Sequence, residues 1–162
     1  VGGGGWMMRT GNAGLSWTQE AAGYTTRTLR AMHVQDARRM WIVGDDSTAM
    51  VTANGGASWV FLEVCVRGQR LNDVAVQEAT GLAWIVTEQG AVCQSHDGGF
   101  TWMLQQQATG IALRHIDMAP SHEPSGNGQD ANEVQLENPI VVGYQGEMKR
   151  YVSAPPPPPP PP

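Results

Sequence analysis

Apolar and polar residues alternate along short stretches of this 162-residue chain, and turn residues separate the stretches. Residues 29–34 alternate in this way, as expected for a half-buried strand. Three more predicted strands follow, at 39–43, 48–52 and 58–64. The last two are joined by a turn at Asn54-Gly55, a strong hairpin signal because both residues tolerate positive φ. We therefore predict four antiparallel strands over about 40 residues, the length of one β-propeller blade.

The same pattern repeats with a period of 42 to 43 residues. The third unit offers strands at 71–76, 82–86, 91–95 and 101–105. Three series of landmarks keep the spacing: a tryptophan closing an octapeptide, a Trp-Ile-Val strand, and a leucine opening a strand. Their members are Trp17, Trp59 and Trp102; Trp41 and Trp84, with Ile140 as a weaker third copy; and Leu29, Leu71 and Leu113. We predict an all-β chain of four-stranded antiparallel β-propeller blades.

The first and last units are incomplete. We assign a β-propeller repeat segment, 1–152, made of a partial blade (1–22), two blades (27–65 and 69–107) and a second partial blade (111–152). The first unit supplies its third and fourth strands, and the last supplies 113–118, 139–143 and 147–152 around a polar insertion loop, 121–138. A fourth box is expected near Ser153, where the chain instead enters a polyproline tail, 153–162, which cannot form a central strand.

The number of blades leaves three arrangements open. Three to four blades make an incomplete ring, since closed rings usually have four to eight. We expect a fragment, an open array, or a ring completed by another chain or by missing blades. The chain begins at Val1 with four glycines after it rather than at Met, which favours a piece cut from a longer protein. The tail is expected to be a stiff spacer or a ligand for aromatic grooves.

Each octapeptide resembles the Asp-box, Ser-x-Asp-x-Gly-x-Thr-Trp: TGNAGLSW at 10–17, TANGGASW at 52–59 and SHDGGFTW at 95–102. We expect the Asx side chain to accept backbone N–H bonds, the glycine to take a backbone conformation costly for other residues, and the tryptophan to pack between layers. The structural residues are Asn12, Gly14, Trp17, Asn54, Gly56, Trp59, Asp97, Gly99 and Trp102. Because asparagine can make the same bonds as aspartate, we predict turns rather than calcium or catalytic sites.

Charge and cysteine content exclude several classes of function. The net charge is −5, with nine scattered arginines and one lysine, which argues against a nucleic-acid partner. Cys65 and Cys93 form no zinc-binding pattern, and we expect no metal and no cofactor. The spacing leaves open whether these cysteines are buried thiols, which we expect, or a disulfide. No stretch approaches the ~18 apolar residues of a membrane span.

Candidate binding residues lie on the predicted first strands, which would line the ring's channel. Arg30 and Arg114 occupy equivalent positions, while the third unit has Asn72 there, so no third arginine is offered in register. The polar residues available beside them are His33, Asp73, His115 and Asp117. We predict that these six residues, without Asn72, bind a protein partner, and we predict no catalytic residue.

The alternative is a carbohydrate-active propeller fragment, like a sialidase or another glycoside hydrolase. A sialidase needs an arginine triad and a tyrosine nucleophile, for which Tyr24, Tyr144 and Tyr151 are available. Most other glycosidases need two separated carboxylates. Asp45 and Asp46 are instead neighbours in one turn.

Two segments carry a family resemblance: WIVGDDSTAMVTANGGASW at 41–59 and GAVCQSHDGGFTW at 90–102. They resemble blades of the photosystem II stability and assembly factor family, over roughly residues 1–152. Ser47 and Thr87 depart from this pattern, which has glycine at both positions. The resemblance implies a non-catalytic scaffold that binds protein partners, including a subunit of a membrane complex. It also implies the thylakoid lumen or another organellar or extracytoplasmic compartment.

Overall fold

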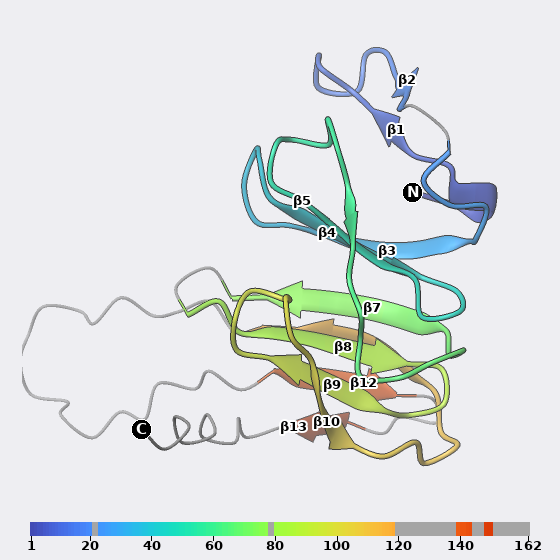
Figure 1. Cartoon of the computed structure of the whole chain (residues 1–162), viewed down its shortest axis with the longest axis vertical. Helices are drawn as coiled ribbons and strands as arrows, with labels where there is room; N and C mark the ends of the chain where they lie inside the picture. Colours follow the sequence, from blue (N-terminus) through green and yellow to red (C-terminus); the bar gives the residue numbers. More distant parts are fainter. Residues whose placement is uncertain (21–22, 78–79, 119–138, 144–147, 151–162) are drawn as a thin grey trace, which may run out of the picture.

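The computed structural model describes residues 1–20, 23–77, 80–118, 139–143 and 148–150, and these form four antiparallel sheets (Figure 1). The first sheet pairs β1 (Met8–Arg9) with β2 (Thr18–Gln19), after a 3-10 turn at Gly3–Gly5. The second contains β3 (Leu29–Val34), β4 (Met40–Gly44), β5 (Ala49–Thr52) and β6 (Val60–Phe61). The third contains β7 (Leu71–Val76), β8 (Ala83–Thr87), β9 (Val92–Ser95) and β10 (Met103–Gln106). The fourth contains β11 (Leu113–Asp117), β12 (Ile140–Gly143) and β13 (Met148–Arg150).

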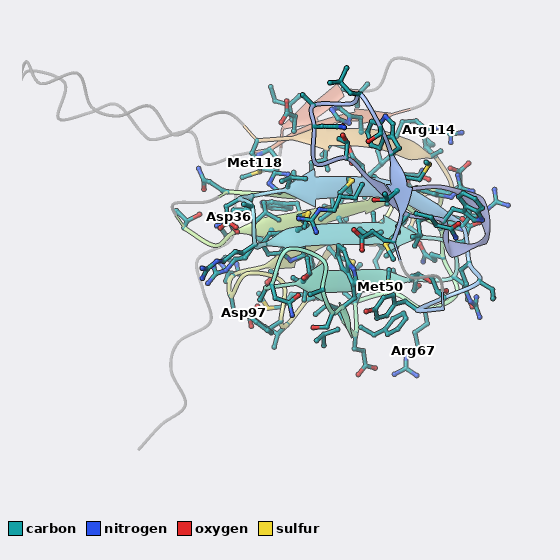
Figure 2. All side chains as sticks on the ribbon, turned by 90° about the horizontal axis from the view of Figure 1, so that it is seen from above. Asp36, Met50, Arg67, Asp97, Arg114 and Met118 are labelled. Atoms are coloured by element: carbon teal, nitrogen blue, oxygen red, sulfur yellow. A yellow bond between two sulfur atoms is a disulfide. The ribbon has the colours of Figure 1, made fainter. Side chains whose placement is uncertain are left out.

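Within each sheet the strands pair in chain order, as in a propeller blade, which confirms the predicted all-β class. Every hairpin therefore turns at one of two ends. The turn between the first and second strands and the Asp-box turn lie at one end, and the turn between the second and third strands lies at the other. Seen from above, Asp36 and Asp97 lie at the first end and Arg114 at the second (Figure 2). These two ends are the surfaces on which function is to be sought.

The inner strands match the sequence prediction closely, whereas the outermost strand of the second sheet is shorter. β3 and β7 have the predicted bounds, but β6 covers two residues of the predicted 58–64. Beyond Phe61 the chain folds back over the core, where Val64 and Val66 are buried. Apolar burial of these two valines thus takes precedence over extending an exposed edge strand.

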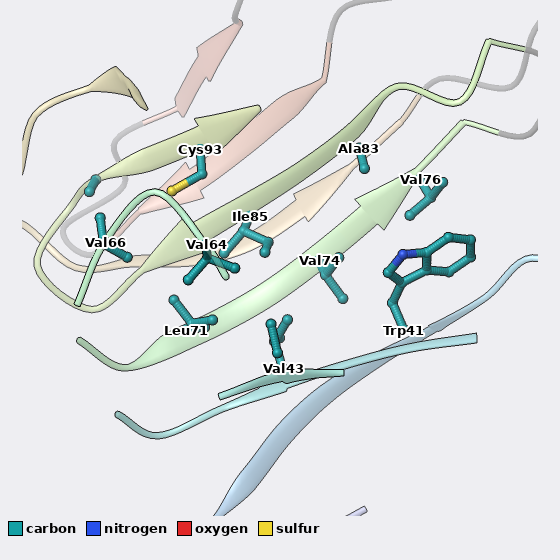
Figure 3. Packing of buried hydrophobic residues seen from close by; sticks show 12 residues of the cluster. Trp41, Val43, Val64, Val66, Leu71, Val74, Val76, Ala83, Ile85 and Cys93 are labelled. Atoms are coloured by element: carbon teal, nitrogen blue, oxygen red, sulfur yellow. The ribbon is translucent and has the colours of Figure 1, made fainter. Parts of the chain in front are cut away.

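Apolar residues from facing sheets form the core. Between the second and third sheets, Trp41 and Val43 of β4 lie opposite Val74 of β7 and Ile85 of β8 (Figure 3). Between the third and fourth sheets the arrangement repeats: Trp84 and Val86, 43 positions after Trp41 and Val43, pack with Leu113, Ile116 and Val141. Equal spacing along the chain therefore produces equivalent layers in space.

Trp17 corrects one expectation about the boxes. Trp59 packs against the cluster between the first and second sheets, and Trp102 against the cluster between the second and third. Each box tryptophan thus covers the side of its sheet that faces the preceding sheet. Trp17 would do the same for the first sheet, but the described residues place no sheet there, and Trp17 is 57% exposed. The prediction that it packs between layers is wrong for this chain.

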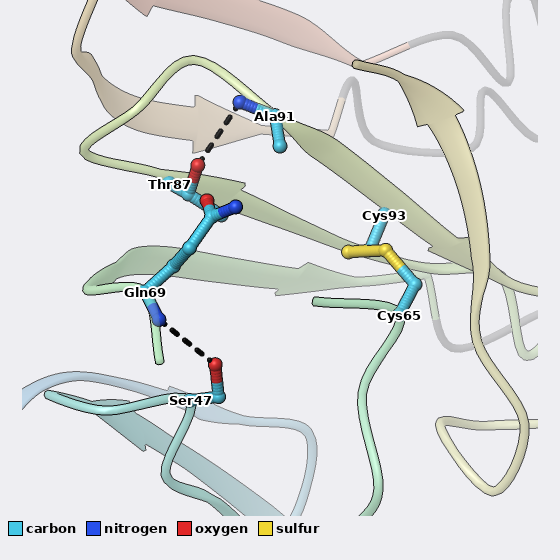
Figure 4. The surroundings of a disulfide bond; sticks show 6 residues. All are labelled: Ser47, Cys65, Gln69, Thr87, Ala91 and Cys93. Atoms are coloured by element: carbon cyan, nitrogen blue, oxygen red, sulfur yellow. Dashed lines mark hydrogen bonds between the residues drawn. A yellow bond between two sulfur atoms is a disulfide. The ribbon is translucent and has the colours of Figure 1, made fainter. Parts of the chain in front are cut away.

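A disulfide joins Cys65 to Cys93, so the expectation of free thiols is wrong (Figure 4). Cys65 lies between β6 and β7, and Cys93 is a fully buried residue of β9. The fold-back of 62–66 onto the core brings their Cα atoms to 6.0 Å. A separation of 28 residues gave no sign of this contact, because it depends on where the short β6 ends.

Several predictions fall outside the described residues. These are the insertion loop 121–138, the tail 153–162, the box near Ser153, and the candidate nucleophiles Tyr144 and Tyr151. Within the described ranges, no helix has the length and apolar character of a membrane span. The same ranges contain no group of three or more His, Cys, Asp or Glu side chains placed to hold a metal ion.

Candidate functional site

The three Asp-box turns use their polar groups internally. The Asx Oδ1 atom accepts the backbone N–H four residues later at 2.9 Å in every copy, from Ser16, Ser58 and Thr101. The hydroxyl two residues before the Asx accepts the glycine N–H at 2.9 Å, in Thr10–Gly14, Thr52–Gly56 and Ser95–Gly99. These glycines have φ of 91°, 89° and 92°, a region that a Cβ disfavours. The boxes therefore act as turns whose polar groups bond within the turn.

One hydrogen bond of Asp97 runs in the opposite direction in the two boxes that have asparagine. Its Oδ2 accepts the Thr101 hydroxyl at 2.6 Å, whereas the Nδ2 groups of Asn12 and Asn54 donate to serine hydroxyls at 2.8 Å. Burial alone would raise the pKa of Asp97. The bonds from Thr101, Ser95 and Phe100 outweigh it and hold that pKa below its usual 3.8.

At the opposite end of the sheets, charged side chains form two ion-paired groups that a backbone hydrogen bond joins. Arg30 of β3 pairs with Asp45, whose Oδ1 also lies 3.9 Å from Nε of Arg70. Arg114 of β11 donates through Nη1 to Oε2 of Glu88 at 2.9 Å. The Glu88 N–H donates to the Arg70 carbonyl at 3.0 Å and so connects the two pairs. We call Arg30, Arg70 and Arg114 the arginine row.

The arginine row contains a residue that the sequence prediction missed. Asn72 occupies the position equivalent to Arg30 and Arg114, so the third unit offered no arginine in register. Arg70 lies two residues earlier, directly before the landmark Leu71, and its side chain reaches Asp45 of the preceding sheet. A search for arginines just before each landmark leucine, rather than only at one register position, would have found it.

Two of the three arginines of the row are well exposed to solvent. Arg70 and Arg114 have 57% and 51% of their side-chain surface exposed, whereas Arg30, Asp45 and Glu88 have 29%, 28% and 27%. The hydrogen bond from Arg30 is the main reason that the pKa of Asp45 lies below its usual 3.8, and the charge of Arg70 adds to it. Each guanidinium has more N–H donors than these contacts use, and the exposed side chains of Arg70 and Arg114 suit carboxylate groups of a partner.

The six predicted binding residues divide into two groups. Arg30 and Arg114 belong to the arginine row, and the other four make different contacts. Asp73 and His115 pair with each other across the third and fourth sheets. Asp73 also accepts the N–H of Val74 at 2.9 Å and that of Ile116 at 3.0 Å, so this buried carboxylate joins β7 to β11. Asp117 accepts the N–H of Met118 at 2.8 Å, and His33 lies edge-on to the Trp41 ring at 6.2 Å between centroids. The His115 side chain is 65% exposed, against 12% for that of Asp73.

The residues of the glycosidase alternative have other surroundings. Tyr24 packs against the apolar cluster between the first two sheets. Asp46 pairs with Arg27 next to the arginine row, and Asp45 belongs to the row's network. Tyr24 is thus held by apolar packing, and Asp45 and Asp46 are held in ion pairs.

Comparison with known proteins identifies the chain's relatives. The family model of the photosynthesis system II assembly factor YCF48 matches residues 1–129. A solved structure described as YCF48 bound to D1 peptide is 26% identical with a TM-score of 0.58, and the match covers 78% of this chain and 38% of that one. YCF48 from Cyanidioschyzon merolae is 20% identical with a TM-score of 0.70, over 91% and 44% of the two chains, and shows the shared fold. No curated protein sequence matches. The chain thus spans about two fifths of the length of these structures.

Proposed function

Because this chain belongs to the photosynthesis system II assembly factor YCF48 family, we propose that it binds a peptide segment of a photosystem II subunit as part of a non-catalytic scaffold. A relative bound to a D1 peptide supports a protein ligand from a membrane complex. We propose D1 as the partner of this chain and an acidic group of the D1 segment as the part it recognises. The predicted blades 27–65, 69–107 and 111–152 would each contribute one arginine to the binding surface.

The observation that carries this proposal is the arginine row. Arg30 and Arg70 share Asp45, Arg114 pairs with Glu88, and Arg70 and Arg114 keep half or more of their side-chain surface exposed. Each guanidinium has five N–H donors in a rigid fork, which matches the two oxygens of a carboxylate. A row that crosses sheets can therefore hold an extended segment with spaced acidic groups.

Binding without catalysis is supported by what the other polar groups do. The Asp-box side chains are used within their turns, and Asp73 holds two backbone N–H groups and His115. A general acid or base has to reach the substrate with its proton-carrying atom. Asp73 is committed to the contact between β7 and β11, which suits a structural part better than a reaction.

The test titrates the full 162-residue chain into overlapping synthetic peptides that together cover D1. Binding to each peptide is measured by fluorescence anisotropy. We expect at least one acidic peptide to bind, and Arg30→Gln with Arg114→Gln to weaken it about tenfold or more. The matched control replaces two arginines at the opposite end of the sheet, Arg38→Gln with Arg39→Gln, and should leave the affinity unchanged. Equal losses for both variants, or no binding peptide, would contradict the proposal.

A further inference from the structure

Asp45 and Glu88 occupy equivalent places in consecutive sheets. Each is the first residue after the second strand of its sheet, and they lie 43 positions apart, the period of the repeat. Their backbones are anchored alike: the Asp45 N–H donates to the Thr28 carbonyl at 2.9 Å, and the Glu88 N–H to the Arg70 carbonyl at 3.0 Å. The repeat thus places a carboxylate at the equivalent position of two consecutive sheets.

Both carboxylates also make the same kind of double contact. One contact comes from the first strand of the same sheet, at equivalent positions: Arg30 to Asp45, and Asn72 to Glu88 at 2.9 Å. The other comes from an arginine of the next sheet: Arg70 to Asp45 at 3.9 Å, and Arg114 to Glu88 at 2.9 Å. The Asn72 amide further donates to the Leu113 carbonyl at 2.7 Å, which fixes the two sheets beside Arg114.

We propose that Asp45 and Glu88 are positioning residues, which hold the guanidinium groups of Arg70 and Arg114 in the orientation that receives an acidic peptide. This inference rests on the proposed function. Free arginine side chains lose much rotational freedom when a ligand immobilises them. A less exposed carboxylate paired with the guanidinium restricts that freedom in advance and leaves the other N–H donors of the fork unused.

Net charge alone predicts the opposite change in affinity for an acidic peptide. Asp45 and Glu88 are negative, so removing either makes the surface more positive and should tighten binding of an acidic peptide. Positioning gives weaker binding instead, because the arginine must then be ordered by the ligand. The direction of the change therefore separates the two accounts.

The experiment measures Glu88→Ala, Asp45→Ala and Asp46→Ala by anisotropy, with the D1 peptide that the wild-type chain binds most tightly as the probe. We expect about a three- to tenfold loss for the first two, since Glu88 accepts a charge-assisted hydrogen bond from Arg114 and Asp45 accepts one from Arg30 beside its ion pair with Arg70. The control Asp46→Ala removes the neighbouring carboxylate of the same turn, which pairs with Arg27. We expect that variant to bind equally well or more tightly.

A double-mutant cycle distinguishes positioning from a general loss of stability. If Glu88 acts through Arg114, then Arg114→Gln should cost much less affinity in the Glu88→Ala background than in wild type. Glu88→Gln, which keeps an acceptor for Asn72 and Arg114, should recover part of the loss and serves if Glu88→Ala does not fold. Additive losses, or tighter binding by Glu88→Ala, would overturn the inference while arginine-dependent binding stands. Absence of any binding D1 peptide would overturn the proposed function and this inference with it.

Discussion

The indole Nε1 of Trp41 donates a hydrogen bond to the carbonyl oxygen of Gly98 at 3.2 Å. This contact joins the second strand of one sheet to the Asp-box turn of the next, 57 residues further along the chain. Gly99 follows at once, and a Cβ there would lie 2.8 Å from the same Nε1. The box glycine thus has two reasons to be glycine: its φ of 92° and the tryptophan of the neighbouring sheet.

We predict that Trp41→Phe lowers the free energy of unfolding by about 1–2 kcal/mol, because it removes a donor at a buried site and leaves a small void. Trp41 is 4% exposed. The control is Trp17→Phe, at an exposed position, with an expected cost below about 0.5 kcal/mol. Chemical denaturation monitored by far-UV circular dichroism measures both, and equal costs would contradict the layered packing described above.

The disulfide should contribute about 2–4 kcal/mol to the free energy of unfolding, since it cross-links residues 28 positions apart. We predict that a dithiol reductant lowers the denaturation midpoint of the wild-type chain. Cys65→Ala with Cys93→Ala should show the lower midpoint with or without reductant. Two titratable thiols in the native chain, before any reductant is added, would show that the disulfide is absent.

Ala13 occupies a position at which the other two boxes have glycine. Its φ is 56°, and the equivalent residues Gly55 and Gly98 have φ of 71° and 76°. A left-handed conformation costs an L-residue about 1–2 kcal/mol, which the larger unfolded-state entropy of glycine offsets in part. We predict that Ala13→Gly stabilises the chain by about 0.5 kcal/mol. Ala57→Gly, at an exposed box position whose φ is not positive, should destabilise it instead.

The pH dependence of stability should include a contribution from Asp97. Its pKa is lower in the folded chain than its usual 3.8, so the ionised form favours folding. That stability is fully present above about pH 3.8 and is lost as the pH falls through the lower folded-state pKa. Asp97→Asn should therefore cost stability at pH 7, by less than about 1 kcal/mol because solvent screens this exposed group, and should cost less at pH 3. A cost that is the same at both pH values would contradict this assignment.

The repeat made most of the fold predictable. A fixed period places equivalent residues in equivalent layers, so the bounds of β3 and β7 followed from alternation and from the landmark leucines. Features that depend on the path between sheets were not predictable in this way. The short β6, the burial of Val64 and the Cys65–Cys93 bond all follow from how one connecting segment covers the core.

The candidate site was predictable only in part, for a related reason. Arg30 and Arg114 stand in register, and the sequence indicated both. Arg70 joins them from a different register position, because its long side chain spans the gap to Asp45. Periodicity also could not show that Asp73 and His115 pair across two sheets, since the residue equivalent to them in the second sheet is Ala31.

The most direct test of the account is to map the peptide-binding surface by NMR chemical-shift perturbation on the isotope-labelled chain, titrated with the tightest-binding D1 peptide. The account predicts the largest shifts at the Nε–H groups of Arg30, Arg70 and Arg114 and at the backbone N–H groups of Asp45 and Glu88. The box amides of Gly14, Gly56 and Gly99, at the opposite end of the sheets, should not shift. Perturbation centred on the box turns, with the arginine resonances unchanged, would contradict it.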